Sequence, residues 1–189
     1  MGKIEPETRP TGVEERRTRE GASWTDPRIW IEKALRAEGR DVEEAADIVA
    51  RQGASRRGQL VADLAAYDEA RRMYERLVKG GRKDLENDLA GLCHNAAFVH
   101  ETADDTSGAL ALVDRAIEIR ERLVTVEGRH DLANELAALY QNKSNAVMNL
   151  GDNRAAVALY DRAIEIYQRL VHVEGRSELA NYLADNYMN

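Results

Sequence analysis

Apolar residues return at the spacing of an α-helix along the second half of the chain, in two consecutive sets. The sets are Leu132, Leu136, Leu139, Tyr140 and Val147, followed by Val157, Tyr160, Ile164, Ile166 and Leu170. Residues three or four positions apart share one face of a helix, so each set predicts an amphipathic helix. Gly151 and Asp152 separate the sets and are typical of a helix end followed by a cap. Because this turn is short, the pattern predicts an antiparallel helix pair.

The paired pattern is repeated at an offset of 47 residues. Residues 108–142 and 155–189 are identical at 23 of 35 aligned positions, which indicates a duplicated structural unit. An older copy at 67–95 fits the same frame once one residue of the later units is removed at the place that corresponds to Lys79–Gly81. The sequence therefore predicts an all-α array of antiparallel helix pairs.

Glycine and polar residues at the turns determine where we expect each helix to begin and end. In the array we expect helices at about 56–79, 83–102, 107–126, 130–150, 153–174 and 177–189. Residues 56–189 would form the repeat domain. Its last repeat would be truncated, because Asn189 aligns with Asn142 in the middle of a helix.

The region before the repeats has a different composition. Residues 1–22 contain almost no large apolar side chain, so we expect this segment to be disordered. We expect residues 23–55 to form two capping helices, at about 25–39 and 41–52, because the first unit of an array has no preceding neighbour to cover it. Trp24 and Trp30 would be core residues of this cap.

Small residues and one aromatic ring recur where helices are expected to cross. Ser144, Ala156, Tyr160 and Ala163 hold these positions in one unit, and the unit before it holds Ala97, Ala109, Val113 and Ala116. The pattern resembles the tetratricopeptide repeat family, and the long helices resemble the repeats of kinesin light chain. The resemblance implies a right-handed α-solenoid in which the first helix of each pair lines a concave groove.

Three features depart from the common tetratricopeptide pattern. The period of 47 residues exceeds the usual period of about 34, Gln168 replaces the terminal Pro, and Lys143 stands where Leu is usual. We therefore expect longer helices than in the common repeat.

Composition and charge limit the classes of partner. The chain has 27 Lys and Arg against 34 Asp and Glu, a net charge of −7, which argues against nucleic acid. A partner attracted by charge alone would be basic. No apolar run reaches the roughly 20 residues that span a bilayer, so we expect no membrane partner. The single cysteine and the polar N-terminus predict a cytoplasmic protein.

No pattern of catalytic or metal-binding residues is present. The four histidines are never three or four residues apart, and HExxH, CxxC and phosphate-binding glycine motifs are missing from the sequence. Cys93 aligns with Tyr140 and Tyr187, which favours a core-facing residue over a nucleophile. Acids that recur in each unit, such as Glu118 and Glu165, are typical of a solvated face. We therefore expect no metal, no cofactor and no enzymatic activity.

Asparagine is the polar residue that recurs most regularly. Asn87, Asn134 and Asn181 return near helix starts, which favours caps or bonds between helices. Asn95, Asn142 and Asn189 return eight positions later. The resemblance implies that the following side chains line the groove: His94, Phe98, Glu101, Thr102, Gln141, Asn145, Met148 and Asn149. A carboxamide can donate to and accept from a peptide backbone. These positions hold no paired Lys or Arg, so the basic carboxylate clamp of some family members is not expected.

The sequence leaves three functions open. The first is a non-catalytic interaction module that binds a peptide or helix from a protein partner or from an adjacent domain of the full-length protein. The second is a regulatory or sensor segment of a larger bacterial signalling protein with a protease, kinase or NTPase domain. The third is a self-assembling scaffold, a homo-oligomer formed through apolar surface at the C-terminal end.

Overall fold

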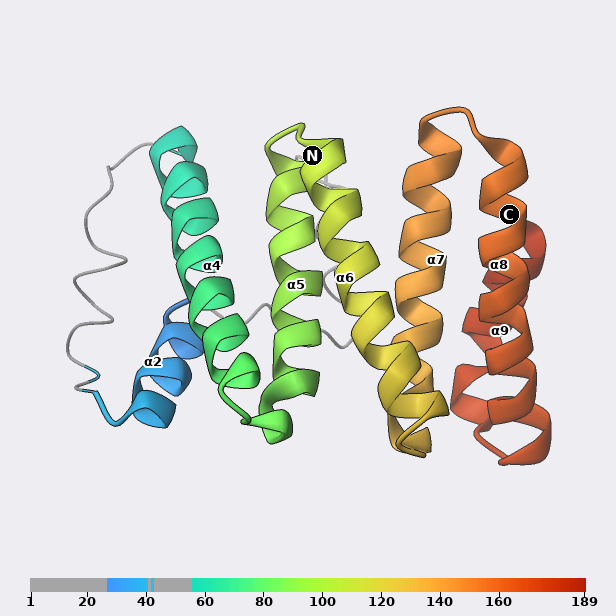
Figure 1. Ribbon diagram of the computed structural model, residues 1–189. Helices are drawn as coiled ribbons and strands as arrows, with labels where there is room; N and C mark the ends of the chain where they lie inside the picture. Colours follow the sequence, from blue (N-terminus) through green and yellow to red (C-terminus); the bar gives the residue numbers. More distant parts are fainter. Residues whose placement is uncertain (1–26, 41, 43–55) are drawn as a thin grey trace, which may run out of the picture.

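The described residues form a row of helices. The computed structural model describes residues 27–40, 42 and 56–189. Its α-helices are, in chain order, α2 (Pro27–Glu38), α4 (Arg56–Lys79), α5 (Glu86–Thr102), α6 (Thr106–Thr125), α7 (Ala133–Asn149), α8 (Asn153–Gln168) and α9 (Ala180–Met188). Helices α4 to α8 stand side by side, α2 lies at one end of α4, and α9 lies behind α8 (Figure 1). All regular structure in the described residues is helical, which confirms the predicted fold class.

The helices pack in sequential antiparallel pairs. The closest pairs are α5 with α6 and α7 with α8, which correspond to the two units predicted from the repeat. We call α5, α7 and α9 the A helices, and α4, α6 and α8 the B helices. The N-caps of α6 and α8 are Asp105 and Asp152, whose carboxylates accept from the backbone N–H groups of Gly108 at 2.9 Å and Ala155 at 3.0 Å.

Each A helix is preceded by a short 3-10 turn, so the helices predicted from 83, 130 and 177 begin three residues later. The turns are η1 (Lys83–Leu85), η2 (His130–Leu132) and η4 (Ser177–Leu179). At η2 the Arg129 guanidinium lies 2.9 and 2.8 Å from the two carboxylate oxygens of Asp131. Equivalent pairs, Arg82 with Asp84 and Arg176 with Glu178, bridge the other turns. The repeated pair holds the tighter turn, which periodicity alone does not reveal.

The B helices end in different ways. Helix α8 ends at Gln168 and continues as a π-turn, η3 (Arg169–Val173), instead of the predicted α-helix to 174. The N–H of Glu174 donates to the carbonyl of Arg169 at 3.1 Å, five residues back, and Glu127 donates to Arg122 in the same way at 3.2 Å. At the end of α4, Arg82 donates to Leu77 at 3.0 Å, five residues back, whereas the equivalent Arg129 donates to Leu123 at 2.9 Å, six residues back. The later units have one residue more than α4 at the place of Lys79–Gly81, and this extra residue widens the last turn of their B helices.

The predicted helix crossings form the core. Ser144, Ala156, Tyr160 and Ala163 are each at most 3% exposed, which lets neighbouring helices approach closely. Val157, one of the predicted apolar set, is 56% exposed. It follows Ala156 directly and therefore lies about 100° round the helix from the buried face.

Trp30 packs in the core at the N-terminal end of the described structure. Its ring makes an edge-to-face contact with Tyr74, with ring centres 5.8 Å apart. A Cβ atom added to Gly91 of α5 would lie 3.5 Å from the Trp30 ring, so this ring also covers α5. Trp30 is a core residue, as predicted. The predicted disordered segment, Trp24 and the helix predicted at 41–52 lie outside the described residues, apart from residue 42.

Candidate functional site

A groove of about 680 Å³ lies along the A helices. Its lining residues are His94, Asn95, Ala97, Phe98, Glu101, Asp104, Thr106, Val113, Gln141, Asn142, Asn145, Ala146, Met148, Asn149, Leu150, Tyr182, Asp185 and Asn189. Six of these side chains are carboxamides, so we call it the amide groove. Helices α5, α7 and α9 contribute most of the lining, and α6 contributes Thr106 and Val113.

Seven of the eight side chains predicted from sequence to line a groove meet in the amide groove. The eighth, Thr102, does not line it; its hydroxyl donates to the carbonyl of Phe98 at 2.9 Å, one turn back in α5. Sequence reasoning missed Asn95 and Asn142 as lining residues, although their recurrence every 47 residues indicated a shared position. It also missed Asp104 and Asp185, for which the sequence contained no such indication.

A hydrogen bond between His94 and Asn142 joins two A helices in the groove wall. The Nδ2 of Asn142 lies 2.9 Å from Nε2 of His94, so the amide donates and the imidazole accepts. Burial, and to a smaller extent the nearby positive charge of Arg120, lower the pKa of His94 to about 4. His94 is therefore neutral near pH 7, which the accepting role requires.

The two groove asparagines of α7 differ in their partners. The hydroxyl of Tyr160 on α8 donates to Oδ1 of Asn145, so this amide holds the second helix of its unit as well as lining the groove. Asn149 is exposed, and within the described residues its side chain has no hydrogen bond. The same holds for Gln141, which is half-buried. Asn149 and Gln141 are thus the amides whose full bonding capacity remains for a ligand.

The asparagines near the helix starts do not behave alike. Asn87 accepts from Nε of Arg120 at 3.4 Å, which confirms a bond between neighbouring helices. Arg120 is 6% exposed, its pKa is lowered by burial, and its Nη1 reaches the carbonyl of Glu135 at 3.5 Å. For Asn134 and Asn181 the described residues supply neither a cap bond nor a bond between helices. A bond between helices is therefore present for Asn87. It is missing for Asn134, because the position of Arg120 is occupied by Tyr167 in the next unit.

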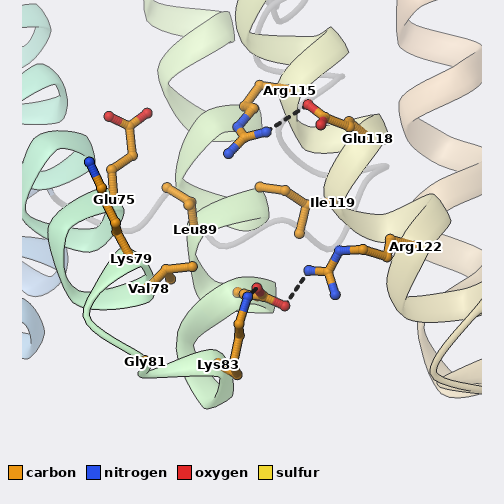
Figure 2. A pocket seen from close by; sticks show the side chains of 11 residues that line it. Glu75, Val78, Lys79, Gly81, Lys83, Leu89, Arg115, Glu118, Ile119 and Arg122 are labelled. Atoms are coloured by element: carbon orange, nitrogen blue, oxygen red, sulfur yellow. Dashed lines mark hydrogen bonds and ion pairs between the residues drawn. The ribbon is translucent and has the colours of Figure 1, made fainter.

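A second cavity, of about 640 Å³, lies between α4, the start of α5, and α6. Figure 2 shows Arg115 pointing to Glu118. The guanidinium of Arg122 forms a salt bridge with the carboxylate of Glu86. Lys83 also binds Glu86, at 3.0 Å. Burial alone would raise the pKa of Glu86, but the hydrogen bonds from Arg122 and Lys83 outweigh it and lower the pKa. Most charges of this cavity are thus neutralised within it.

The charged cavity was not predicted from the sequence. Glu86 is 4% exposed and stands where the later units have Ala133 and Ala180. A single acid in a row of alanines indicated a local difference, but not the basic side chains that approach it from α6.

The described residues show no arrangement typical of a catalytic or metal site. Cys93 is fully buried, and burial raises the pKa of its thiol to about 12, so the thiolate nucleophile is not formed near pH 7. This confirms the core-facing position predicted for it. No group of three or more His, Cys, Asp or Glu side chains that could hold a metal ion occurs in the part of the chain that the structure describes. None of the described helices is both long and apolar enough to cross a bilayer.

Comparison with known proteins identifies the repeat. The family model described as the tetratricopeptide repeat matches residues 132–172, which contain η2, α7, α8 and most of η3. The searches of curated proteins and of solved structures gave no significant match. Tetratricopeptide repeats are in general protein–protein interaction modules and are typically non-catalytic. Residues 132–172 are therefore a tetratricopeptide repeat of the kinesin light chain type, set within an array of helix pairs.

Proposed function

We propose that this chain is a non-catalytic interaction module that binds a peptide or helix in the amide groove. The observation that carries this proposal is the convergence of six carboxamides and several apolar side chains on one groove of about 680 Å³. The bound segment comes from a partner protein or from another domain of the full-length protein. Loops play little part in the lining, so the site is built on helices that pack rigidly against one another.

The lining combines two kinds of contact that peptide recognition needs. Phe98, Met148 and Tyr182 offer apolar surface, which supplies affinity when it is covered by a side chain of the ligand. Gln141 and Asn149 can donate to and accept from a peptide backbone and so determine its register. A bound peptide would therefore be held by a few apolar anchors and oriented by amides.

The proposal can be tested with a random 12-residue peptide library displayed on phage, followed by fluorescence polarisation with the selected peptides. The variant Gln141→Ala with Asn149→Ala removes two lining amides that have no hydrogen bond within the described residues. We expect it to weaken binding about threefold to tenfold, as loss of one or two hydrogen bonds does, with little change in melting temperature. Asn145 is not used, because its loss would leave the Tyr160 hydroxyl without its acceptor.

The matched control is Asn181→Ala, which removes an exposed carboxamide from an A helix outside the groove. Its binding should equal that of the unchanged protein. A library that yields no binder, or binders that the groove variant holds as tightly as the unchanged protein, would contradict the proposal.

Self-association is a second candidate, supported by the outer face of α9. Tyr187 and Met188 are 59% and 77% exposed, whereas the equivalent Tyr140 is 4% exposed because α8 covers it. Exposed apolar side chains of this size favour contact with another surface. Light scattering should show a mass that rises with protein concentration, and Tyr187→Ser with Met188→Ser should remove that rise. A constant monomer mass for the unchanged protein would exclude this function.

A further inference from the structure

We propose that the segment bound in the amide groove is basic, with Lys or Arg side chains that meet the carboxylates of Glu101, Asp104 and Asp185. This inference rests on the proposed function and adds the chemical class of the ligand.

The charges of the lining all have the same sign. Glu101, Asp104 and Asp185 line the groove, and no Lys or Arg is among the lining residues. His94 contributes no positive charge near pH 7, because burial lowers its pKa to about 4. Among the described residues, the groove lining therefore has three carboxylates and no Lys or Arg.

The carboxylates lie on both sides of the amides. Glu101 is in the last turn of α5, Asp104 follows that helix, and Asp185 belongs to α9, while α7 between them contributes Gln141 and Asn149. The C-terminal end of a helix carries a partial negative charge, so the end of α5 adds to the attraction for a cation. A peptide that crosses the A helices would meet negative charge, then amides, then negative charge again.

Two of these carboxylates are not neutralised by their neighbours. Within the described residues, neither Asp104 nor Asp185 has a salt bridge or a side-chain hydrogen bond. Two bases of the neighbouring helices are engaged elsewhere: Arg120 is buried against Asn87 and Glu135, and Lys143 pairs with Asp114 at 2.6 Å.

An acidic ligand would be disfavoured at the same place. Its carboxylates or phosphates would meet three like charges and find no Lys or Arg in the lining. The net charge of −7 on the whole chain acts in the same direction at longer range. The charged cavity of Figure 2 does contain bases, but Glu86 and Glu118 already pair with Arg122 and Arg115. Charge complementarity thus selects a basic segment for the amide groove.

The experiment uses the same 12-residue phage library and then sequences the binders. We expect Lys and Arg to be enriched and Asp and Glu to be depleted relative to the unselected library. The variant Asp104→Asn with Asp185→Asn should weaken the selected peptides about threefold to tenfold at 50 mM NaCl, and the difference should shrink at 500 mM, where charges on a surface are screened.

The matched control is Asp161→Asn with Glu165→Gln, which removes the same net charge from exposed positions of α8 outside the groove. It should leave binding within about twofold of the unchanged protein. If both double variants weaken binding equally, the attraction is non-specific and the inference is wrong.

The remaining outcomes separate this inference from the proposed function. Binders without excess Lys or Arg that still depend on Gln141 and Asn149 would overturn the basic ligand and leave the groove as the binding site. Binders that ignore Gln141 and Asn149, or no binders at all, would overturn both.

Discussion

Tyr140 on α7 donates its phenolic hydroxyl to the carboxylate of Glu121 on α6, across the junction between two units. Arg162 on α8 joins this contact, with Nη1 2.9 Å from the carboxylate and 3.0 Å from the phenolic oxygen. Its guanidinium also lies over the Tyr140 ring, 5.6 Å from the ring centre. One tyrosine thereby links three helices, so this junction depends on polar bonds as well as on apolar packing.

The change Tyr140→Phe should lower the free energy of unfolding by about 1–2 kcal/mol, because it removes the hydrogen bond donated to the half-buried carboxylate of Glu121 and the one accepted from Arg162. Urea unfolding would measure the change. Tyr187→Phe is the control, since Tyr187 holds the same position in the next unit but is 59% exposed; there we expect less than about 0.5 kcal/mol. The Tyr187 hydroxyl also has a hydrogen bond, which it accepts from Nε2 of Gln168. Equal losses at both positions would show that burial does not strengthen the hydrogen bonds of this tyrosine.

The change Ala163→Leu should lower the free energy of unfolding by roughly 1–3 kcal/mol, because the helix crossing at this fully buried position leaves no room for a larger side chain. Glu165→Ala, on the exposed side of the same helix, should change it by less than about 0.5 kcal/mol. Thermal or urea unfolding would measure both. If Ala163→Leu is as harmless as Glu165→Ala, the close crossing assigned to α8 is wrong.

Stability should fall as the pH is lowered from about 6.5 to about 4, and His94 should account for part of the fall. Its pKa in the folded protein is about 4, against an ordinary value of 6.5, so in this window the unfolded chain binds a proton that the folded protein does not. The difference between the two pKa values limits the loss of unfolding free energy that His94 causes to about 3 kcal/mol. Above pH 6.5 neither state binds the proton, so His94 causes no loss there.

Urea unfolding at pH 7.5 and pH 4.5 measures this dependence. His94→Gln should reduce the difference between the two pH values, and His172→Gln, at an exposed position, is the control. An identical pH dependence in the unchanged protein and in His94→Gln would show that His94 is protonated as easily in the folded protein as in the unfolded chain.

The change Asp104→Gly should raise the free energy of unfolding by about 0.5–1 kcal/mol. Asp104 has φ of 60°, a left-handed conformation that Gly adopts without steric cost. The equivalent residue of the next unit is Gly151, with φ of 88°. The reverse change, Gly151→Asp, should destabilise by a similar amount in the same urea measurement. A loss of stability in Asp104→Gly would mean that the carboxylate makes a stabilising contact in the folded protein.

Much of the fold could be predicted from the sequence, because repeated local patterns determine it. The period of 47 residues, the helix pairs and the buried small positions such as Ala116 and Ala163 all follow from which side chains recur at helical spacing. These features depend on residues within a turn or two of one another, or on the same residue in the next unit. A single sequence contains that information in full.

The finer backbone features were not predictable in the same way. The sequence shows that the first unit is one residue shorter near Lys79–Gly81. Only the backbone hydrogen bonds show that the last turn of the B helix is narrower there than in the later units. The left-handed conformation of Asp104 was hidden likewise, because Asp is compatible with several turn conformations and neighbouring residues decide among them.

The sequence by itself therefore determined the helix pairs, their period, the family resemblance and seven of the side chains that line the amide groove. Only the tertiary structure decided which polar groups bind one another. His94 and Asn142 are 48 residues apart, Arg120 and Asn87 are 33 apart, and Tyr160 and Asn145 belong to different helices. Hydrogen bonds need donor and acceptor within about 3 Å, and that proximity arises only when the helices pack, which is also why Asp104 and Asp185 come to share one groove.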